Sequence, residues 1–396
     1  MIIGVVGKPN VGKSTFFKAA TLAEVYIANY PFATIKPNSG VGYVRIDCAD
    51  KHFNVQCNPR QGYCLDHQRF VPVQMIDVAG LVPGAHEGLG LGNQFLDDLR
   101  QADALIHVID IAGTTNEKGE PVDALTYDPS NDVKFLEVEL DMWYFQILKK
   151  GWEKFARTIQ QTKEEVHKAI GKQLSGLKVT EEMVEDSVRQ LELSPDVIKW
   201  TDDDLKRLAT ELRKLTKPMI IAANKMDIPG AEKNFERIKL QFPDYHFVAC
   251  SSESELALKE AARHNLIKYV PGNNNFEAVG AMSEKQQDAL GFIKKNILEK
   301  FGSTGIQEVL NYAVFNLLEY IAIFPGGVNK LTDSHGNVLP DCFLMPPNSK
   351  AIDFAFKLHS DFGNNFIRAI DVKSKKTVGK DHPLKHCDVV EIISGK

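Results

Sequence analysis

The stretch at residues 4–15, GVVGKPNVGKST, decides the fold, because it places the pattern GxxxxGK[ST] between an apolar strand and a helix-compatible run. In that setting the glycines allow backbone N–H groups to surround a phosphate chain, and the N-terminus of the helix adds further donors. We expect Lys13 to reach the β- and γ-phosphates of a nucleotide and the Ser14 hydroxyl to ligate Mg²⁺. The predicted nucleotide-binding residues of this loop are Gly7, Lys8, Pro9, Asn10, Val11, Gly12, Lys13, Ser14 and Thr15.

A second segment, MIDVAG at residues 75–80, supplies a carboxylate and a glycine after another apolar strand. Asp77 can hold the same Mg²⁺ through water, and Gly80 offers an unobstructed N–H to the γ-phosphate. Between these two motifs, the loop NYPFATIKPNSG contains Thr34, whose hydroxyl can close on the metal and the γ-phosphate. We therefore predict Ser14, Thr34 and Asp77 as metal ligands and Lys13, Thr34 and Gly80 as catalytic residues.

A third segment, IIAANKMD, ends an apolar strand with Asn224, Lys225 and Asp227. A carboxylate at Asp227 can accept hydrogen bonds from N1 and the N2 amine of guanine, whereas adenine has an acceptor at N1 and lacks the amine. We expect the Lys225 stem to pack along the base. A later segment, FVACSSESE, offers the backbone N–H groups of Ser251 and Ser252 to guanine O6. These residues predict a preference for GTP.

The pattern of apolar runs predicts an α/β fold. Short β-branched runs alternate with helical segments, which indicates a mainly parallel sheet covered on both faces. After Ile111 a charged, helical region interrupts this alternation. Within it, apolar positions in residues 148–170 follow three- and four-residue steps with one polar gap at Thr162, which predicts one long helix. Two shorter helices are expected after threonine N-caps at Thr180 and Thr201.

The end of the chain predicts a separate small domain, with four extended segments and one helix at about residues 350–362. The expected division is a nucleotide-binding domain in two parts, at 1–115 and 217–282, with an inserted helical arm at 116–216. Connecting helices at 283–316 lead to the C-terminal domain at 317–396.

Composition excludes several classes of protein. The chain has 396 residues, a formal net charge of −5 and a pI near 6.2, whereas a general nucleic-acid coat is strongly basic. We expect no sequence-specific DNA contact, and any RNA contact should be a local patch. One candidate is a lysine-rich turn containing Lys373, Lys375, Lys376, Lys380 and Lys385, although a solvated turn explains the same residues. Without an apolar run able to span a bilayer, we expect a cytoplasmic protein with no membrane partner.

Six cysteines are too few for a disulfide scaffold in a chain of this length. Three of them, Cys48, Cys57 and Cys64, alternate with His52 and His67, and all five residues are potential zinc ligands. No CxxC pair anchors them, which favours a polar hairpin with incidental thiols over a metal site. Both interpretations stay open.

With these motifs in order, the chain resembles the YchF or Obg-like ATPase subfamily of Obg-related, translation-factor-class P-loop GTPases. The resemblance rests on NYPFATIKPN, on DVAGLVPGAHEGLGLGNQFLDDLR and on the final domain that begins near EYIAIF, and it spans essentially the whole chain. It implies a GTPase domain, an inserted coiled-coil-like arm and a C-terminal TGS domain with a β-grasp fold. It also implies association with the ribosome, through rRNA and ribosomal proteins, by way of the arm and the TGS domain.

The resemblance also bears on nucleotide choice and catalysis. Many members have a degenerate base-recognition motif and favour ATP, whereas this chain keeps the motif at Asn224 to Asp227 intact. Leu81 stands where many GTPases have the glutamine that orients the attacking water, and leucine cannot do so. The group that replaces it is open: Asn10 resembles a potassium-coordinating asparagine or only shapes its loop, and His86 is a second candidate or a solvated histidine.

Three functions compete. A slow, ribosome-associated GTPase acting as a nucleotide switch explains all the motifs, with an ATP-preferring regulatory NTPase of the same family as its variant. A metabolic P-loop phosphotransferase would not need the N-K-x-D motif or the switch residues Thr34 and Asp77. A scaffold that uses nucleotide only structurally is the third possibility.

Overall fold

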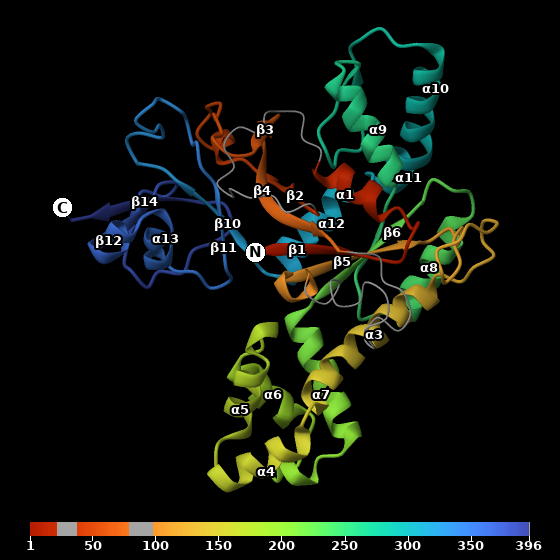
Figure 1. Cartoon of the computed structure of the whole chain (residues 1–396). Coiled ribbons are helices and arrows are strands. Elements are labelled where there is room, and N and C mark those ends of the chain that lie inside the picture. The colour runs from red at the N-terminus through yellow and green to blue at the C-terminus, as the bar shows by residue number, and fades with distance from the viewer. Residues whose placement is uncertain (22–37, 79–97, 396) are drawn as a thin grey trace. The chain divides into compact units, whose positions relative to one another are not determined.

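The computed structural model describes residues 1–21, 38–78 and 98–395 (Figure 1). Two compact units divide the chain. The first comprises Met1–Phe17 and Met75–Ser252, and the second comprises Lys18–Gln74 and Glu253–Lys396. Among the described helices, none combines the length and the apolar character needed to cross a bilayer.

The first unit is built on a mainly parallel sheet. Its strands are β1 (Ile2–Val6), β5 (Ala104–Asp110), β6 (Met219–Asn224) and β7 (Phe247–Ala249), and the end of β4 (Gln68–Asp77) lies beside β1. The pairs β1–β5, β5–β6 and β6–β7 all run parallel. Every residue of β5 and β6 is buried, which accounts for the mostly apolar sequences of these strands. The α/β prediction is confirmed.

The described helices of the first unit either connect strands of the sheet or lie in the insertion between β5 and β6. Helix α1 (Lys13–Thr21) starts in this unit, and α8 (Ala231–Gln241) follows β6. The insertion contains α3 (Ser130–Lys149), α4 (Trp152–Thr162), α5 (Val166–Gln173), η3 (Ser175–Leu177), α6 (Glu181–Gln190), η4 (Val197–Lys199) and α7 (Asp202–Thr216). Figure 1 shows α3 and α7 side by side, with α4, α5 and α6 beyond them.

The prediction of one long helix over residues 148–170 is wrong. Gly151 (φ 75°) and Lys163 (φ 55°) both take left-handed backbone conformations, which end one helix before the next begins. The apolar steps were real, because Trp152, Ala156 and Ile159 are buried along α4. The predicted N-caps are confirmed: the hydroxyls of Thr180 and Thr201 accept from the N–H groups of Met183 and Asp204.

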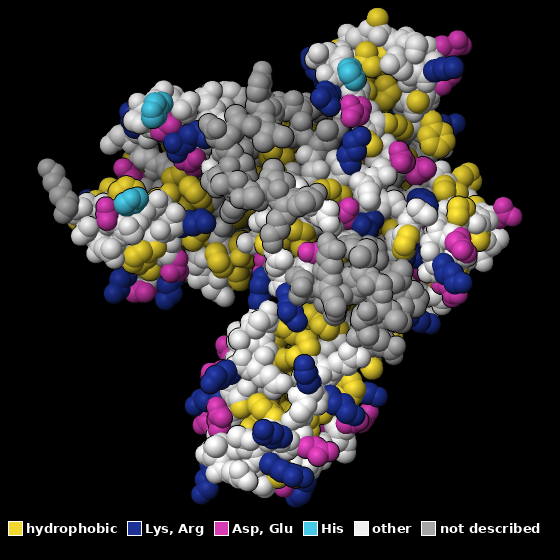
Figure 2. All heavy atoms as spheres, viewed as in Figure 1, with side chains coloured by type: hydrophobic (Ala, Val, Ile, Leu, Met, Phe, Trp, Pro, Cys, Tyr) yellow, Lys and Arg dark blue, Asp and Glu magenta, His cyan; other side chains and the backbone are white. Residues whose placement is uncertain are grey.

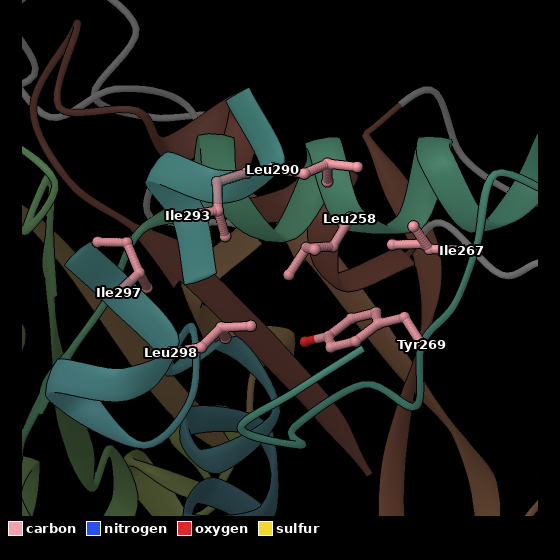
Figure 3. Close-up of a cluster of buried hydrophobic side chains, with 7 residues drawn as sticks. All are labelled: Leu258, Ile267, Tyr269, Leu290, Ile293, Ile297 and Leu298. Atoms are coloured by element: carbon pink, nitrogen blue, oxygen red, sulfur yellow. The ribbon is translucent and has the colours of Figure 1, made fainter. Parts of the chain in front are cut away.

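The second unit begins with β2 (Ser39–Asp47), η1 (Ala49–Lys51) and β3 (Tyr63–Leu65), which pairs antiparallel with β4. Its helical part contains α9 (Ser252–Arg263), which starts at the end of the first unit, then β8 (Ile267–Lys268), β9 (Glu277–Ala278), α10 (Glu284–Ile293), η5 (Lys294–Leu298), α11 (Glu299–Phe301), α12 (Ile306–Tyr312) and η6 (Ala313–Leu317). Figure 3 shows the core that joins these segments, where Leu258 of α9 faces Tyr269, Leu290 and Leu298.

The C-terminal part forms its own mixed sheet, in the order β11-β10-β14-β12-β13. The strands are β10 (Ile321–Pro325), β11 (Phe343–Met345), β12 (Phe366–Asp371), β13 (Lys376–Val378) and β14 (Asp388–Ser394), and α13 (Ala351–Leu358) and α14 (Ser360–Asn364) precede β12. Phe354 of α13 packs on Ile323, Ala369 and Val390 of the sheet. The predicted single helix is broken at His359, whose backbone is extended and whose Nδ1 caps α14 by accepting from the N–H of Asp361.

Candidate functional site

The loop between β1 and α1 is held in a conformation that needs glycine at its end. Gly12 has φ +90°, and a Cβ there would lie 2.3 Å from Nδ2 of Asn224. That amide donates to the carbonyl of Val11 at 2.9 Å, so the loop and the end of β6 are tied together. Helix α1 starts at Lys13, so its first N–H groups are directed toward the loop, as a phosphate site requires.

Lys13, Ser14 and Asp77 converge beside this loop. The Lys13 ammonium lies 2.5 Å from Oδ1 of Asp77, and the Ser14 hydroxyl lies 3.5 Å from Oδ2 of the same carboxylate. Both side chains of the ion pair are partly exposed. A hydroxyl and a carboxylate from adjacent segments are the hard oxygen donors that Mg²⁺ takes, so these residues fit the metal that this type of site binds.

The base-recognition motif is organised by hydrogen bonds at the end of β6. Asn224 is 3% exposed, and its Oδ1 accepts from the N–H and the hydroxyl of Ser252 at 3.0 and 2.9 Å. The half-buried Asp227 accepts from the Ser251 hydroxyl at 2.8 Å. The Ser252 N–H is therefore engaged within the protein, which differs from its expected role as a donor to guanine O6. Ser251 instead orients the carboxylate expected to read the base.

Lys225 links the base-recognition motif to the phosphate loop, and it also contacts Asp110, a residue that the sequence analysis did not single out. Its ammonium donates to the carbonyl of Asn10, to Oδ2 of Asp110 and to the Thr114 hydroxyl, all at 2.9 to 3.0 Å. Asp110 is fully buried at the end of β5, and the hydroxyl of Thr115 also donates to it. The sequence signal that could have identified Asp110 is a carboxylate at the end of a mostly apolar strand. The buried carboxylate of Asp110 holds the Lys225 ammonium at the adjoining ends of β5 and β6.

The Lys8 side chain is buried within the protein, against Asp132 and Tyr127. It is 4% exposed, and its ammonium pairs with Asp132 at 2.8 Å and lies 3.8 Å from the Tyr127 ring centroid. Burial lowers the pKa of Lys8, and the Asp132 carboxylate opposes that shift. What Lys8 can offer a nucleotide is its backbone N–H.

Asn10, the candidate potassium ligand, has a left-handed backbone (φ 63°) and donates from Nδ2 to the carbonyl of Gly119 at 2.9 Å. The contact links the loop to the turn that begins the insertion. A cation at Asn10 would have to bind Oδ1, because Nδ2 is a donor.

The structure brings together the predicted residues of the loop, Asp77 and the motifs around Asn224 and Ser251. Thr34, Gly80, Leu81 and His86 lie outside the described residues. Their expected roles stay predictions.

Three family models match the chain. Residues 2–139 match the model described as a 50S ribosome-binding GTPase. Residues 222–327 match the G4 motif-containing domain of Obg-like GTPases of the YGR210-like kind, and residues 335–394 match the TGS domain.

Individual relatives align with most or all of the chain. A GTP-binding protein of Methanocaldococcus jannaschii is 51% identical over 396 residues, which is 99% of each chain. The crystal structure of a GTP-binding protein from Pyrococcus horikoshii OT3 superimposes with a TM-score of 0.79 at 40% identity, covering 100% of both chains. The ribosome-binding ATPase YchF of Mycoplasma pneumoniae is 30% identical over 330 residues, which is 78% of this chain and 81% of that protein.

Proposed function

Because this chain belongs to the YchF or Obg-like family of P-loop GTPases, we propose that it is a slow cytoplasmic GTPase whose nucleotide state controls its binding to the ribosome. The observation that carries this proposal is the intact base-recognition set at the end of β6. Asn224 bridges Val11 and Ser252, Lys225 reaches Asn10, and Asp227 is oriented by Ser251. A phosphotransferase acting on a small molecule has no use for this arrangement.

Guanine selectivity rests on Asp227 in this proposal. A carboxylate that pairs with two guanine donors loses both of them on meeting adenine, and such polar mismatches can reject a wrong substrate by factors of about 10⁴. The ATPase name of the Mycoplasma pneumoniae relative makes an ATP-preferring enzyme the second candidate.

Competition binding separates the two candidates. GTP should displace a fluorescent guanine nucleotide from the purified chain at far lower concentration than ATP. Asp227→Asn should narrow that difference, because one acceptor becomes a donor, while Asp244→Asn, on an exposed turn, should leave it unchanged. Equal displacement by ATP and GTP in the wild type would favour the ATP-preferring enzyme.

The phosphate end of the site would use Lys13, Ser14 and Asp77. Ser14 and Asp77 would hold Mg²⁺, which neutralises phosphate charge when bound. When nucleotide binds, Lys13 would exchange its contact with Asp77 for contacts with phosphate oxygens. Lys13→Ala should abolish nucleotide binding or turnover while the circular dichroism spectrum stays that of the wild type.

Since Leu81 cannot orient water, we propose that added positive charge or loop order near the γ-phosphate supports hydrolysis instead. In related enzymes a supplied positive group is worth about 10³ to 10⁵ in rate. The test compares the wild type, Leu81→Gln and Asn10→Ala in potassium and in sodium. A large gain in hydrolysis rate from Leu81→Gln alone would refute this proposal. Equal rates in the two salts would show that potassium does not contribute to hydrolysis.

The arm offers a basic surface for a ribosomal partner. Between residues 145 and 178 the chain has eight Lys or Arg residues and three Glu residues, and all eight cations are exposed. Lys149, Lys168 and Lys178 form surface ion pairs. Figure 2 shows many Lys and Arg side chains on the visible face of these helices. An excess of exposed cations suits the phosphates of rRNA, even though the whole chain is acidic.

Ribosome binding is tested by cosedimentation and by GTP turnover. Ribosomes should sediment with the chain and raise multiple turnover, and Lys154→Glu with Arg157→Glu should weaken both effects and reduce the dependence of binding on salt. A matched pair on α8, Lys233→Glu with Lys239→Glu, serves as the charge control. No cosedimentation in any nucleotide state would contradict the ribosomal role and leave the GTPase proposal standing.

A further inference from the structure

Three cysteines and an aspartate gather between β2 and β3, in the second unit. Cys48 follows β2, Asp50 lies in η1, Cys57 lies in the following loop and Cys64 lies in β3. One ligand atom from each of these four residues lies within 4.8 Å of every other. Residues spread over 17 positions of an irregular loop are thus brought to one point.

The spacing of the donor atoms fits one tetrahedral metal ion. Sγ of Cys48 lies 3.5 Å from Sγ of Cys57, and Sγ of Cys64 lies 3.9 Å from Oδ2 of Asp50. Zinc–sulfur bonds of about 2.3 Å in a tetrahedron place sulfur atoms about 3.8 Å apart, close to the 3.5 Å between the sulfur atoms of Cys48 and Cys57. Cys48, Cys57 and Asp50 are at most 4% exposed, so water contributes little to the cluster.

The aspartate is held as a metal ligand is held. His67 Nδ1 lies 2.9 Å from Oδ1 of Asp50, and the N–H of Cys57 donates to Oδ2 at 3.1 Å. Hydrogen bonds of this kind, made by groups that do not bind the metal themselves, fix the orientation of a ligating carboxylate. They also account for His67, which the sequence placed among the possible ligands: it lies behind Asp50 and orients it.

We propose that Cys48, Cys57, Cys64 and Asp50 bind one structural Zn²⁺ ion. Three thiolates exclude Mg²⁺ and Ca²⁺ as the natural occupants, because those ions take oxygen ligands. Binding forms three Zn–S bonds and one Zn–O bond, and the three thiol protons pass to solvent. The site is independent of the nucleotide chemistry, so it stands or falls separately from the proposed GTPase function.

The ion would shape a loop that has its own structural role. Between Cys57 and Cys64 the backbone N–H groups of Asn58 and Arg60 donate to the carbonyls of Val338 and Pro340, at 2.8 and 2.9 Å. The described residues 52–62 have no helix or strand to hold them in that conformation. A zinc clip at the base of this loop would supply the missing constraint.

Metal content of the purified full-length chain tests the proposal. After gel filtration in metal-free buffer, elemental analysis should find one zinc per chain. Cys57→Ser and Cys64→Ser should reduce it to less than one tenth, and Cys250→Ala, at a buried free cysteine of the first unit, should retain it. Replacing zinc with Co²⁺ should produce the visible absorption of tetrahedral cobalt–thiolate coordination, which the two serine variants should lack.

Measurements on the wild type alone can refute the proposal, so the test does not depend on whether the variants fold. The site would be refuted if wild-type protein, produced with zinc in the growth medium, contained less than a tenth of an equivalent of zinc per chain. It would also be refuted if a thiol titration of the denatured, unreduced chain found four thiols and peptide mapping placed the one disulfide between Cys48 and Cys57. Strong chelation should lower the melting temperature of the wild type, and an unchanged melting temperature after complete zinc removal would refute the structural role.

Discussion

At the scale of single residues, Gly12 shows how little freedom the nucleotide loop has. Its backbone is left-handed, and the place of a Cβ is already filled by the Asn224 amide. The same amide donates to Val11, so a side chain at residue 12 would disturb both motifs at once.

Gly12→Ala should therefore weaken nucleotide binding by at least about tenfold, since a left-handed alanine alone costs about 1–2 kcal/mol. Gly176→Ala is the matched control, because no atom lies within 4 Å of its Cβ position. Calorimetric titration of both variants with nucleotide measures the difference. Equal affinity in the two variants would show that the loop accommodates a side chain.

His107 makes the first unit sensitive to acid. It is 2% exposed in β5, and burial, helped by the positive charge of Lys8, lowers its pKa to about 3. Among the described residues, its Nδ1 has no hydrogen-bond partner. Because the pKa is lower in the folded than in the unfolded chain, the unfolded state takes up a proton first, and stability present above pH 6.5 is lost as the pH falls toward 3.

His107→Asn should remove this contribution. Below pH 6.5 the free energy of unfolding of the wild type should fall more steeply than that of the variant, by up to about 1.4 kcal/mol per pH unit. Urea denaturation at several pH values measures the slopes, and His264→Gln, at an exposed histidine, should keep the wild-type slope. Parallel curves for the wild type and His107→Asn would contradict the assignment.

At the scale of elements, a polar network joins α3 and α7 at the base of the arm. Arg213 is 2% exposed and donates to Asp141 at 2.7 Å, and the Thr210 hydroxyl donates to the same carboxylate. Nearby, the hydroxyls of Tyr144 and Thr216 lie 2.7 Å apart. The two helices are thus linked by polar contacts as well as by apolar packing.

Arg213→Ala should lower the free energy of unfolding by about 3 kcal/mol, because it leaves the Asp141 carboxylate without its countercharge at a position that is 25% exposed. Arg189→Ala removes a cation that is 76% exposed and pairs with Asp186, so its cost should stay below about 1 kcal/mol. Urea denaturation followed by circular dichroism compares the two. Similar costs would mean that the buried pair contributes no more than a surface pair.

At the scale of the whole molecule, a buried arginine joins segments far apart in the chain. Within the second unit, Arg69 of β4 is fully buried and donates to the carbonyls of Leu339 and Pro340, at 3.2 and 2.8 Å. Its guanidinium therefore ties the hairpin at residues 63–70 to the C-terminal part of the same unit.

Arg69→Met should lower the stability of the second unit by about 2–3 kcal/mol, since two hydrogen bonds from a charged group are lost. Amide exchange should become faster at Leu339, whose N–H donates to Leu331. Arg263→Met, at an exposed arginine on α9, should change neither. Unchanged exchange at Leu339 in Arg69→Met would show that the guanidinium is not what holds this segment.

Much of the site could be predicted because its chemistry depends on residue type at short spacing. The roles predicted for Gly7 to Ser14 and for Asn224 to Asp227 rest on motifs only a few residues long, and the parallel sheet follows from mostly apolar runs that are buried on both faces. For the same reason, the threonine caps of α6 and α7 were predictable, since a cap acts on the next three residues.

What depends on distant partners was decided only by the tertiary structure. The breaks at Gly151 and Lys163, where the backbone is left-handed, interrupt apolar steps that continue on both sides of them. The contact of Lys225 with Asp110, the burial of Lys8 and the convergence of Cys48, Asp50, Cys57 and Cys64 each join residues from separate elements. Local spacing therefore determined the fold class and the nucleotide loop of this protein, whereas burial and long-range packing determined which charged groups pair and where its thiols meet.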